Sequence, residues 1–169
     1  MNAKIGFISS IVALATLVTL TACQSTSKDA EPPLEYADLL VTEGMLTTAE
    51  WQGLQRREAR YPIEGAREGK EGCATLEYVI TPDYSITDVR IVSTTAAPFA
   101  REALSAMQKW SIHAMPVGLI NEPIKTQTRF EFCLENHTGR CALAQLNQFS
   151  RCSGTDVLPS IGYRVVQTG

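Results

Sequence analysis

The 169-residue sequence is poor in the side chains that enzymes use most often for proton transfer and metal binding. It contains only two histidines, His113 and His137, and neither lies in a nucleophile or metal-binding motif. Two carboxylates, Asp83 and Asp88, flank an expected hairpin, where we expect both to be solvated. The sequence therefore predicts neither catalysis nor a bound cofactor.

A glycine-rich phosphate-binding loop is also missing. Gly65, Gly69 and Gly72 lie close together but lack the strand-then-helix context that such a loop requires. Positive charge is not in excess either, because 15 Lys and Arg stand against 18 Asp and Glu. Nucleic acid is therefore not an expected partner.

The N-terminus has the plan of an export signal. Lys4 precedes an uncharged apolar run over residues 5–21, and the small residues Thr21-Ala22 stand directly before Cys23. This arrangement resembles the lipobox of bacterial lipoproteins, in which cleavage precedes a cysteine that receives acyl chains. An uncleaved membrane-spanning helix and an ordinary signal peptide followed by a chance cysteine are the alternatives. We expect residues 1–22 to be the signal peptide and Cys23 to carry the lipid.

The next segment, residues 23–33, is predicted to be a lipid-anchored tether. It is polar and contains two prolines, as flexible linkers often do, and several acyl chains anchor a protein durably. Gln24 in place of Asp implies, by the lipoprotein resemblance, sorting to the outer membrane. We therefore expect an envelope protein that is held to the outer membrane through its lipid and faces the periplasm.

Four cysteines remain after Cys23, namely Cys73, Cys133, Cys141 and Cys152. An even number of cysteines in an exported protein favours disulfides, since the envelope beyond the inner membrane is oxidising. A zinc site made of the last three cysteines and His137 is the alternative, but it lacks the close Cys-x-x-Cys spacing. We expect two disulfides and no metal.

Periodicity predicts an α+β domain. Residues 34–59 look helical in two pieces, with Thr47 and Glu50 forming a capping box. Alternating residues indicate strands over 73–80, 86–93 and 124–134, and helical spacing indicates a helix over 98–110. These elements form a three-stranded antiparallel sheet covered on one face by two helices. The C-terminal extension, residues 137–169, is weakly patterned.

Short motifs follow one another in order between residues 60 and 134. They read RYP at 60–62, EGA at 64–66, KEG at 70–72, ITPD at 80–83, VRIVS at 89–93, REALSAMQKW at 101–110 and TRFEFCL at 128–134. No single motif is specific, but the ordered set resembles the C-terminal domain of TonB, the periplasmic energy transducer. The resemblance implies that residues 60–136 form a TonB-type domain.

In TonB the last strand of the sheet lies at an edge, and an extended peptide of an outer-membrane receptor pairs with it. On this chain the resemblance implies that the side chains at that edge are Lys125, Gln127, Arg129 and Glu131. Arg60, Tyr61 and Pro62 match a second contact region of the family. The alternatives are an edge protected by its own charges and a Tyr61 ring that simply packs where Pro62 stops a helix.

Two departures from the family limit what the resemblance implies. The leader ends in a lipobox, and the tether is short. The sequence therefore offers no evident segment through which a proton-driven motor of the inner membrane could act on the domain. The function is therefore either partner binding by strand addition in TonB-dependent transport, or an accessory, structural role in the outer membrane without energy coupling. Pairing of the C-terminal tail with the last strand would weaken the case for partner binding.

The hairpin also departs from the family. Tyr84 replaces the family's glycine, and a left-handed Tyr costs about 1–2 kcal/mol, so we expect a different turn type.

The family arrangement also implies a disulfide pairing. If the third strand lies antiparallel beside the first, the start of one meets the end of the other. Cys73 opens the first strand and Cys133 nearly closes the third, on the same face. We therefore expect Cys73 to pair with Cys133, and Cys141 with Cys152.

Replacement of Cys23 by serine tests the lipid anchor. We expect the wild-type protein to fractionate with membranes and to yield an acylated N-terminal peptide beginning at Cys23 in mass spectrometry. The Cys23→Ser variant should lose its membrane association, because the thiol that receives the acyl chains is gone. Unchanged membrane association of this variant, or Lys4 retained in the mature chain, would contradict the prediction.

Overall fold

The computed structural model describes residues 36–112, 114–148 and 150–164. These residues belong to one unit, Pro33–Gly169. The signal peptide, Cys23, the tether and His113 lie outside the described residues, so what was expected of them stays a prediction. Among the described residues, no helix has the length and apolar character needed to cross a membrane.

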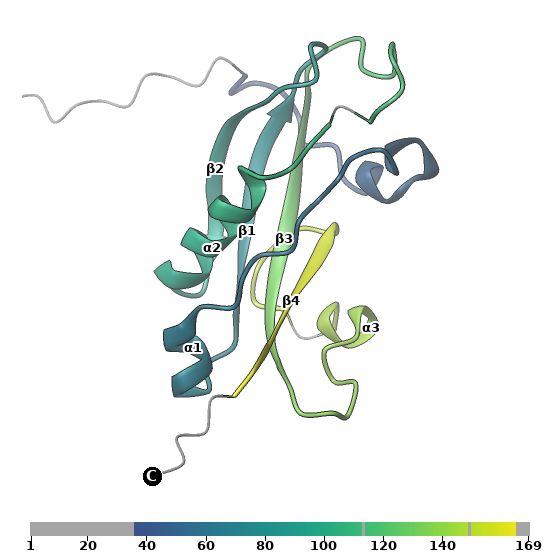
Figure 1. Cartoon of the computed structure of the whole chain (residues 1–169). Helices are drawn as coiled ribbons and strands as arrows, with labels where there is room; N and C mark the ends of the chain where they lie inside the picture. The colour runs from purple at the N-terminus through teal and green to yellow at the C-terminus, as the bar shows by residue number, and fades with distance from the viewer. Residues whose placement is uncertain (1–35, 113, 149, 165–169) are drawn as a thin grey trace, which may run out of the picture. The chain divides into compact units, whose positions relative to one another are not determined.

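The described chain folds into a mixed α+β domain, as expected (Figure 1). Two short 3-10 turns, Met45–Thr47 and Ala49–Trp51, come first. The remaining elements are α1 (Ile63–Glu68), β1 (Gly72–Ile80), β2 (Ile86–Thr94), α2 (Ala97–Met107), β3 (Ile124–Glu135), α3 (Leu143–Leu146) and β4 (Val157–Tyr163).

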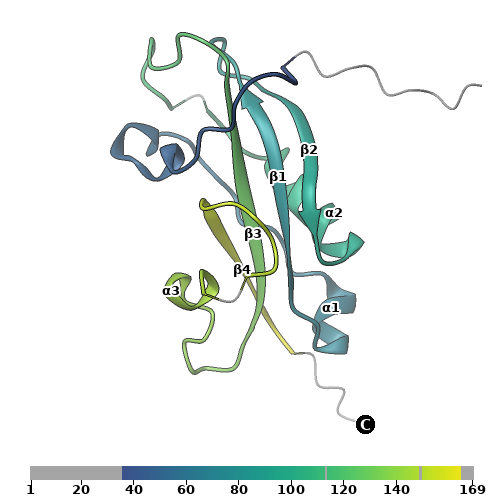
Figure 2. The ribbon, with the colours of Figure 1, turned by 180° about the vertical axis from the view of Figure 1, so that it is seen from behind.

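The four strands form one sheet in the order β2-β1-β3-β4 (Figure 2). β1 pairs antiparallel with both β2 and β3, as the hairpin and the family resemblance implied. The expectation of three strands is wrong, because the C-terminal tail supplies β4, which runs parallel to β3 and pairs with residues 129–135. The outer strands of the sheet are therefore β2 and β4, and β3 is an inner strand over this stretch.

Both faces of the sheet are covered, which explains why β1 is buried along its whole length. On one face, Tyr78 and Phe130 pack in a core that includes Phe99 of α2. On the other face, the loop before β4 reaches Thr75, whose hydroxyl donates a hydrogen bond to the Ser153 carbonyl at 2.6 Å. The tail thus completes the edge of the sheet and also lies over its second face.

The helices expected over residues 34–59 do not form, and this prediction is wrong. Thr47 lies inside the first 3-10 turn, where its hydroxyl donates to the Gly44 carbonyl at 2.7 Å and caps no helix. Trp51 is buried in the core, and Gln55 pairs through its backbone with Ser111. Tertiary contacts therefore override a weak local preference for helix. The short helix of this region, α1, begins only after Pro62.

The β1–β2 hairpin also differs from the expectation of a changed turn type. Tyr84 adopts a left-handed backbone conformation, with a φ of 63°. Its side chain offsets the backbone strain, because the hydroxyl donates to the Pro116 carbonyl and accepts from the Leu119 amide. The ring also packs against the core. A residue with a large side chain is therefore retained where the family has glycine.

Phe130 and Val117 provide a matched test of the core. Phe130 is 0% exposed, whereas Val117 is 98% exposed. We expect Phe130→Ala to lower the free energy of unfolding by about 3–5 kcal/mol, because it removes buried surface and leaves a cavity. Val117→Ala should change it by less than about 0.5 kcal/mol. Urea denaturation of the purified protein measures both, and equal losses would contradict the burial of Phe130.

Candidate interaction site

The outer side of β3, where the resemblance implies that a partner binds, is covered by two segments of the same chain. β4 pairs with residues 129–135, and Val41 forms a parallel bridge with Lys125. Next to this bridge, the Thr42 amide donates to the Lys125 carbonyl at 2.8 Å. Thr155, just before β4, donates a side-chain hydrogen bond to Glu43 at 3.3 Å, which links the two covering segments.

The side chains expected to face a partner are instead engaged within the chain. Lys125, Arg129 and Glu131 are buried, and Gln127 is half-buried. Lys125 donates from Nζ to the Ala37 carbonyl at 2.7 Å. Gln127 donates from Nε2 to Glu77 at 2.7 Å. The edge is therefore not protected by solvated charges, and three of its four expected side chains are inaccessible in this state.

Arg129 holds the segment that precedes β4. Its guanidinium donates to the Gly154 carbonyl at 2.6 Å and to the Asn147 side chain at 3.0 Å. It also lies 2.9 Å from the carboxylate of Glu131, which accepts a hydrogen bond from Ser150. Burial raises the pKa of Glu131, although the Ser150 hydroxyl and Arg129 act in the opposite direction. Two residues of β3 thus bind the tail through buried charges.

The second expected contact region consists of Arg60, Tyr61 and Pro62, and these three residues lie in different environments. Arg60 is exposed, and Pro62 precedes the first residue of α1. The Tyr61 ring lies edge-on to Phe132 with ring centres 6.0 Å apart, and its hydroxyl donates to the Lys70 carbonyl at 2.6 Å. The same ring lies over the backbone of Gly162 in β4. Tyr61 is therefore a packed ring whose neighbour is the tail strand.

A buried ion pair anchors the start of β4. Asp156 is 3% exposed, and both of its carboxylate oxygens accept from Arg56, at 2.5 and 2.7 Å. Thr128 of β3 donates to the same carboxylate at 2.6 Å, and its own hydroxyl lies 2.9 Å from that of Tyr78. The Arg56 guanidinium also lies 6.0 Å from the centre of the Trp110 ring. This network joins the N-terminal segment, the sheet and the tail.

The two disulfides join Cys73 to Cys152 and Cys133 to Cys141, so the expected pairing is wrong. The strand register explains the error, because Cys73 lies opposite Glu131. Cys133 is two residues further along β3, and such diagonal neighbours are about 7–8 Å apart. A disulfide requires Cβ atoms within about 3.5–4.5 Å. Cys73 therefore reaches the tail instead.

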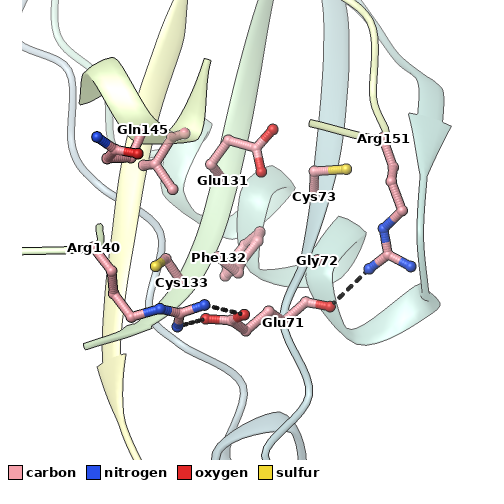
Figure 3. A pocket seen from close by; sticks show the side chains of 10 residues that line it. Glu71, Gly72, Cys73, Glu131, Phe132, Cys133, Arg140, Gln145 and Arg151 are labelled. Atoms are coloured by element: carbon pink, nitrogen blue, oxygen red, sulfur yellow. Dashed lines mark hydrogen bonds and ion pairs between the residues drawn. The ribbon is translucent and has the colours of Figure 1, made fainter. Parts of the chain in front are cut away.

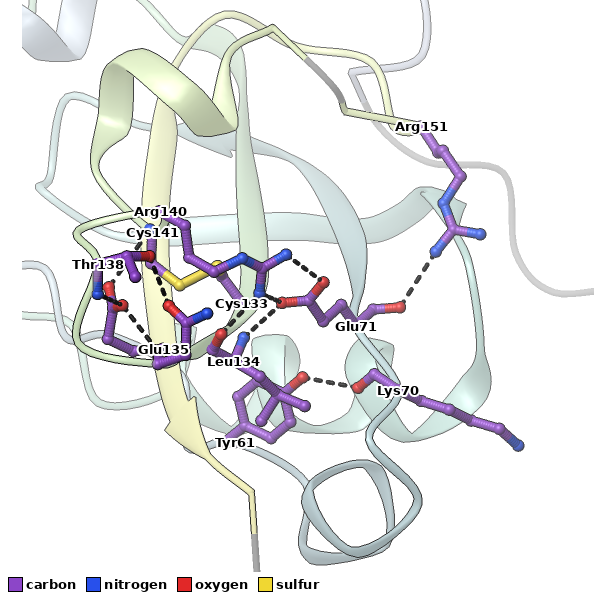
Figure 4. Close-up of polar contacts among 11 residues, drawn as sticks. Tyr61, Lys70, Glu71, Cys133, Leu134, Glu135, Thr138, Arg140, Cys141 and Arg151 are labelled. Carbon is purple, nitrogen blue, oxygen red and sulfur yellow. Dashed lines mark hydrogen bonds and ion pairs between the residues drawn. A yellow bond between two sulfur atoms is a disulfide. The ribbon is translucent and has the colours of Figure 1, made fainter.

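A cavity of about 330 Å³ lies where β1 begins and β3 ends (Figure 3). Arg140 and Arg151 of the tail lie on either side of Glu71; Arg140 pairs with its carboxylate, and Arg151 donates to its carbonyl at 3.1 Å. Figure 4 shows that Glu71 also accepts from the Leu134 amide. Burial would raise the pKa of Glu71, but these hydrogen bonds from Arg140 and Leu134 hold it below its ordinary value. The charges around the cavity therefore tie the tail to the sheet.

Comparison with known families identifies the domain. The model of the Gram-negative bacterial TonB protein C-terminal family matches residues 57–134. These residues make up less than half of the chain, so the likeness to this family holds for the domain and not for the whole chain. The solution NMR structure of the Pseudomonas aeruginosa TonB C-terminal domain is similar, with 22% sequence identity and a TM-score of 0.40, over 51% of this chain and 91% of that chain. No curated protein matches this chain.

The tail lies beyond the part of the chain that matches the TonB family. Asp156, Gly162 and β4 are the elements of this site that sequence reasoning missed. A signal was present, since Val157, Leu158 and Ile161 are typical strand residues. Pro159 in the same run is compatible with an edge strand. What no local pattern indicated was that this strand would pair with β3 of the TonB domain.

Removal of each disulfide tests how the tail is held. The Cys73–Cys152 bond closes a separation of 79 residues and Cys133–Cys141 one of 8. On the loop-entropy model, Cys73→Ser/Cys152→Ser should lower the free energy of unfolding by about 4–5 kcal/mol and Cys133→Ser/Cys141→Ser by about 2–3 kcal/mol. Urea denaturation measures both values, and non-reducing peptide mapping checks the pairing. A Cys73–Cys133 peptide in the wild-type protein would refute the structure at this point.

Proposed function

We propose that this chain is an outer-membrane lipoprotein of TonB-dependent transport. Its TonB domain binds an extended segment of an outer-membrane receptor, or of another envelope protein, at the outer side of β3. Cys23 anchors the protein, and the tether of residues 23–33 keeps the domain near the periplasmic face of that membrane. Domains of the TonB C-terminal type transduce energy or bind proteins, and we assign no catalysis to this one.

One observation carries the proposal, namely the seating of β4 on β3. The same pairing fills the edge in this state and so counts against partner binding, unless the partner displaces the tail. The tail adds to this edge as a parallel strand, so the edge accepts an extended segment. In strand addition, main-chain hydrogen bonds supply affinity and flanking side chains supply specificity. Arg129 and Tyr61, which the family resemblance marks as partner contacts, both contact the tail. The tail therefore occupies the place proposed for the partner, which must displace it.

The second candidate is an accessory lipoprotein that keeps the TonB fold without energy coupling. The Cys73–Cys152 disulfide and the Arg56–Asp156 ion pair support this role, because both hold the tail in place. In this role the edge stays filled, and the domain contributes a stable envelope structure. The two candidates differ in whether β3 ever meets another protein.

Photo-crosslinking in intact cells distinguishes them. Gln127 is a suitable position for a photoreactive residue, since it lies between the parts of β3 that Val41 and β4 cover. We expect capture of an outer-membrane receptor, at a higher yield in Cys73→Ser/Cys152→Ser, because the tail is then less firmly held. The matched control, Cys133→Ser/Cys141→Ser, should behave like the wild type.

Mass spectrometry of the crosslinked product identifies the captured protein and the segment involved. Absence of an envelope protein from the crosslinks of all three proteins would refute strand addition at β3. The accessory role would then be the remaining function. Equal crosslinking yields from both disulfide variants would show that loss of the Cys73–Cys152 bond does not expose the outer side of β3.

A further inference from the structure

We infer that the outer side of β3 selects its partner by three positions of an extended segment. The segment runs parallel to β3 and carries a carboxylate at the position of Asp156 and small residues at the positions of Ser160 and Gly162. The partner is thus a peptide of the form acidic-x-x-x-small-x-small. This inference rests on the proposed function, because it names the kind of segment that strand addition at β3 would accept.

The first requirement comes from a cation that is fixed in place. Arg56 is held beside the Trp110 ring and gives two hydrogen bonds to Asp156, and Thr128 gives a third. A neutral side chain here would leave a charged guanidinium without its counterion in a half-buried site, which is unfavourable. A planar guanidinium also matches the two oxygens of a carboxylate. This end of the outer side of β3 therefore selects an acidic residue.

The second requirement is small size at two positions that face the core. A Cβ atom built on Gly162 would overlap Cγ of Tyr61, so no side chain fits there unless the ring moves. Ser160 is 0% exposed, and its hydroxyl has no hydrogen-bond partner among the described residues. The site therefore requires a small residue there and makes no use of the hydroxyl.

The positions that follow each of the two small residues are tolerant. Ile161 and Tyr163 alternate with the two small residues, and their side chains are 45% and 58% exposed. Because successive side chains of a strand point to opposite faces, these positions face away from Tyr61 and the core. Toward the end of the segment, only every second residue therefore contributes to selection.

The tail strand can be exchanged for another segment without breaking a covalent bond. Cys152 attaches the tail to β1 four positions before Asp156, and residues 153–164 are held by non-covalent contacts. A competing strand can therefore displace β4 from its C-terminal end, where Gly162 lies under Tyr61, toward Asp156. The charge of Arg56 then favours a segment that restores the carboxylate.

Complementation in trans tests the inference. The full mature chain carries Asp156→Asn and Gly162→Val, which disable its own strand but keep both disulfides. A fluorescent peptide copying residues 155–164 is then added, and fluorescence anisotropy measures its binding. We expect binding to the variant and at least tenfold weaker binding to the wild-type chain, because there the peptide must first displace β4. Peptides with Asp156→Asn, Ser160→Leu or Gly162→Val should bind at least tenfold more weakly, and a peptide with Ile161→Ala should bind equally well.

Adding Arg56→Gln to the same protein completes a double-mutant cycle between Arg56 of the protein and Asp156 of the peptide. This change should abolish the difference between the unaltered peptide and the peptide with Asp156→Asn, and leave the penalty for Gly162→Val intact. Circular dichroism checks that each variant is folded; if the double variant is not, Gly162→Ala alone provides a milder opening. Equal binding of the acidic and neutral peptides to the double variant, or equal binding of the unaltered peptide and the peptide with Gly162→Val, would overturn the inference.

The two proposals fail separately. If the peptides discriminate as expected but no envelope protein is crosslinked at Gln127 in cells, the selectivity of the β3 edge holds and the proposed function falls. If a receptor is crosslinked but the peptides do not discriminate, strand addition holds and the three-position rule is wrong.

Discussion

A strand at the edge of a sheet leaves a row of backbone N–H and C=O groups unpaired, and these groups attract any extended chain nearby. β3 spans Ile124–Glu135, and along most of its outer side this chain satisfies the constraint with its own segments. The position of the tail, the burial of the expected contact residues and the placement of the disulfides all depend on that pairing. The edge of the TonB domain is consequently paired with β4, a strand from the same chain.

Buried charges determine which strand pairs there and in what register. Arg56 and Asp156 come from opposite ends of the described chain, and Arg129 and Glu131 from adjacent positions on one face of β3. Desolvation offsets much of the attraction within such pairs, so they are weak sources of net stability. An unpaired partner is costly, however, and any other register would leave one. The ion pairs therefore specify the arrangement of the tail more than they stabilise the fold.

The two disulfides have different roles in this arrangement. Cys133–Cys141 closes a short loop after β3, whereas Cys73–Cys152 joins β1 to the segment before β4. The second bond holds the tail close to its edge even when the strand itself is displaced. A tethered segment competes at high effective concentration, so an incoming partner needs good complementarity to replace it. Under the proposed function, one chain thereby combines an interaction edge with protection against unspecific pairing.

The sequence by itself determined the strands of the β1–β2 hairpin, helix α2 and β3, because alternation and helical spacing are local signals, and it pointed to the TonB family through ordered motifs. It also indicated that four cysteines would pair. Only the tertiary structure decided which ones, since a difference of two residues in register separates Cys73 from Cys133. The same holds for the N-terminal segment, where burial of Trp51 and pairing of Gln55 with Ser111 replaced the expected helix. Contacts between residues as distant as Arg56 and Asp156 have no local signature, and for that reason the covered edge became visible only in the folded chain.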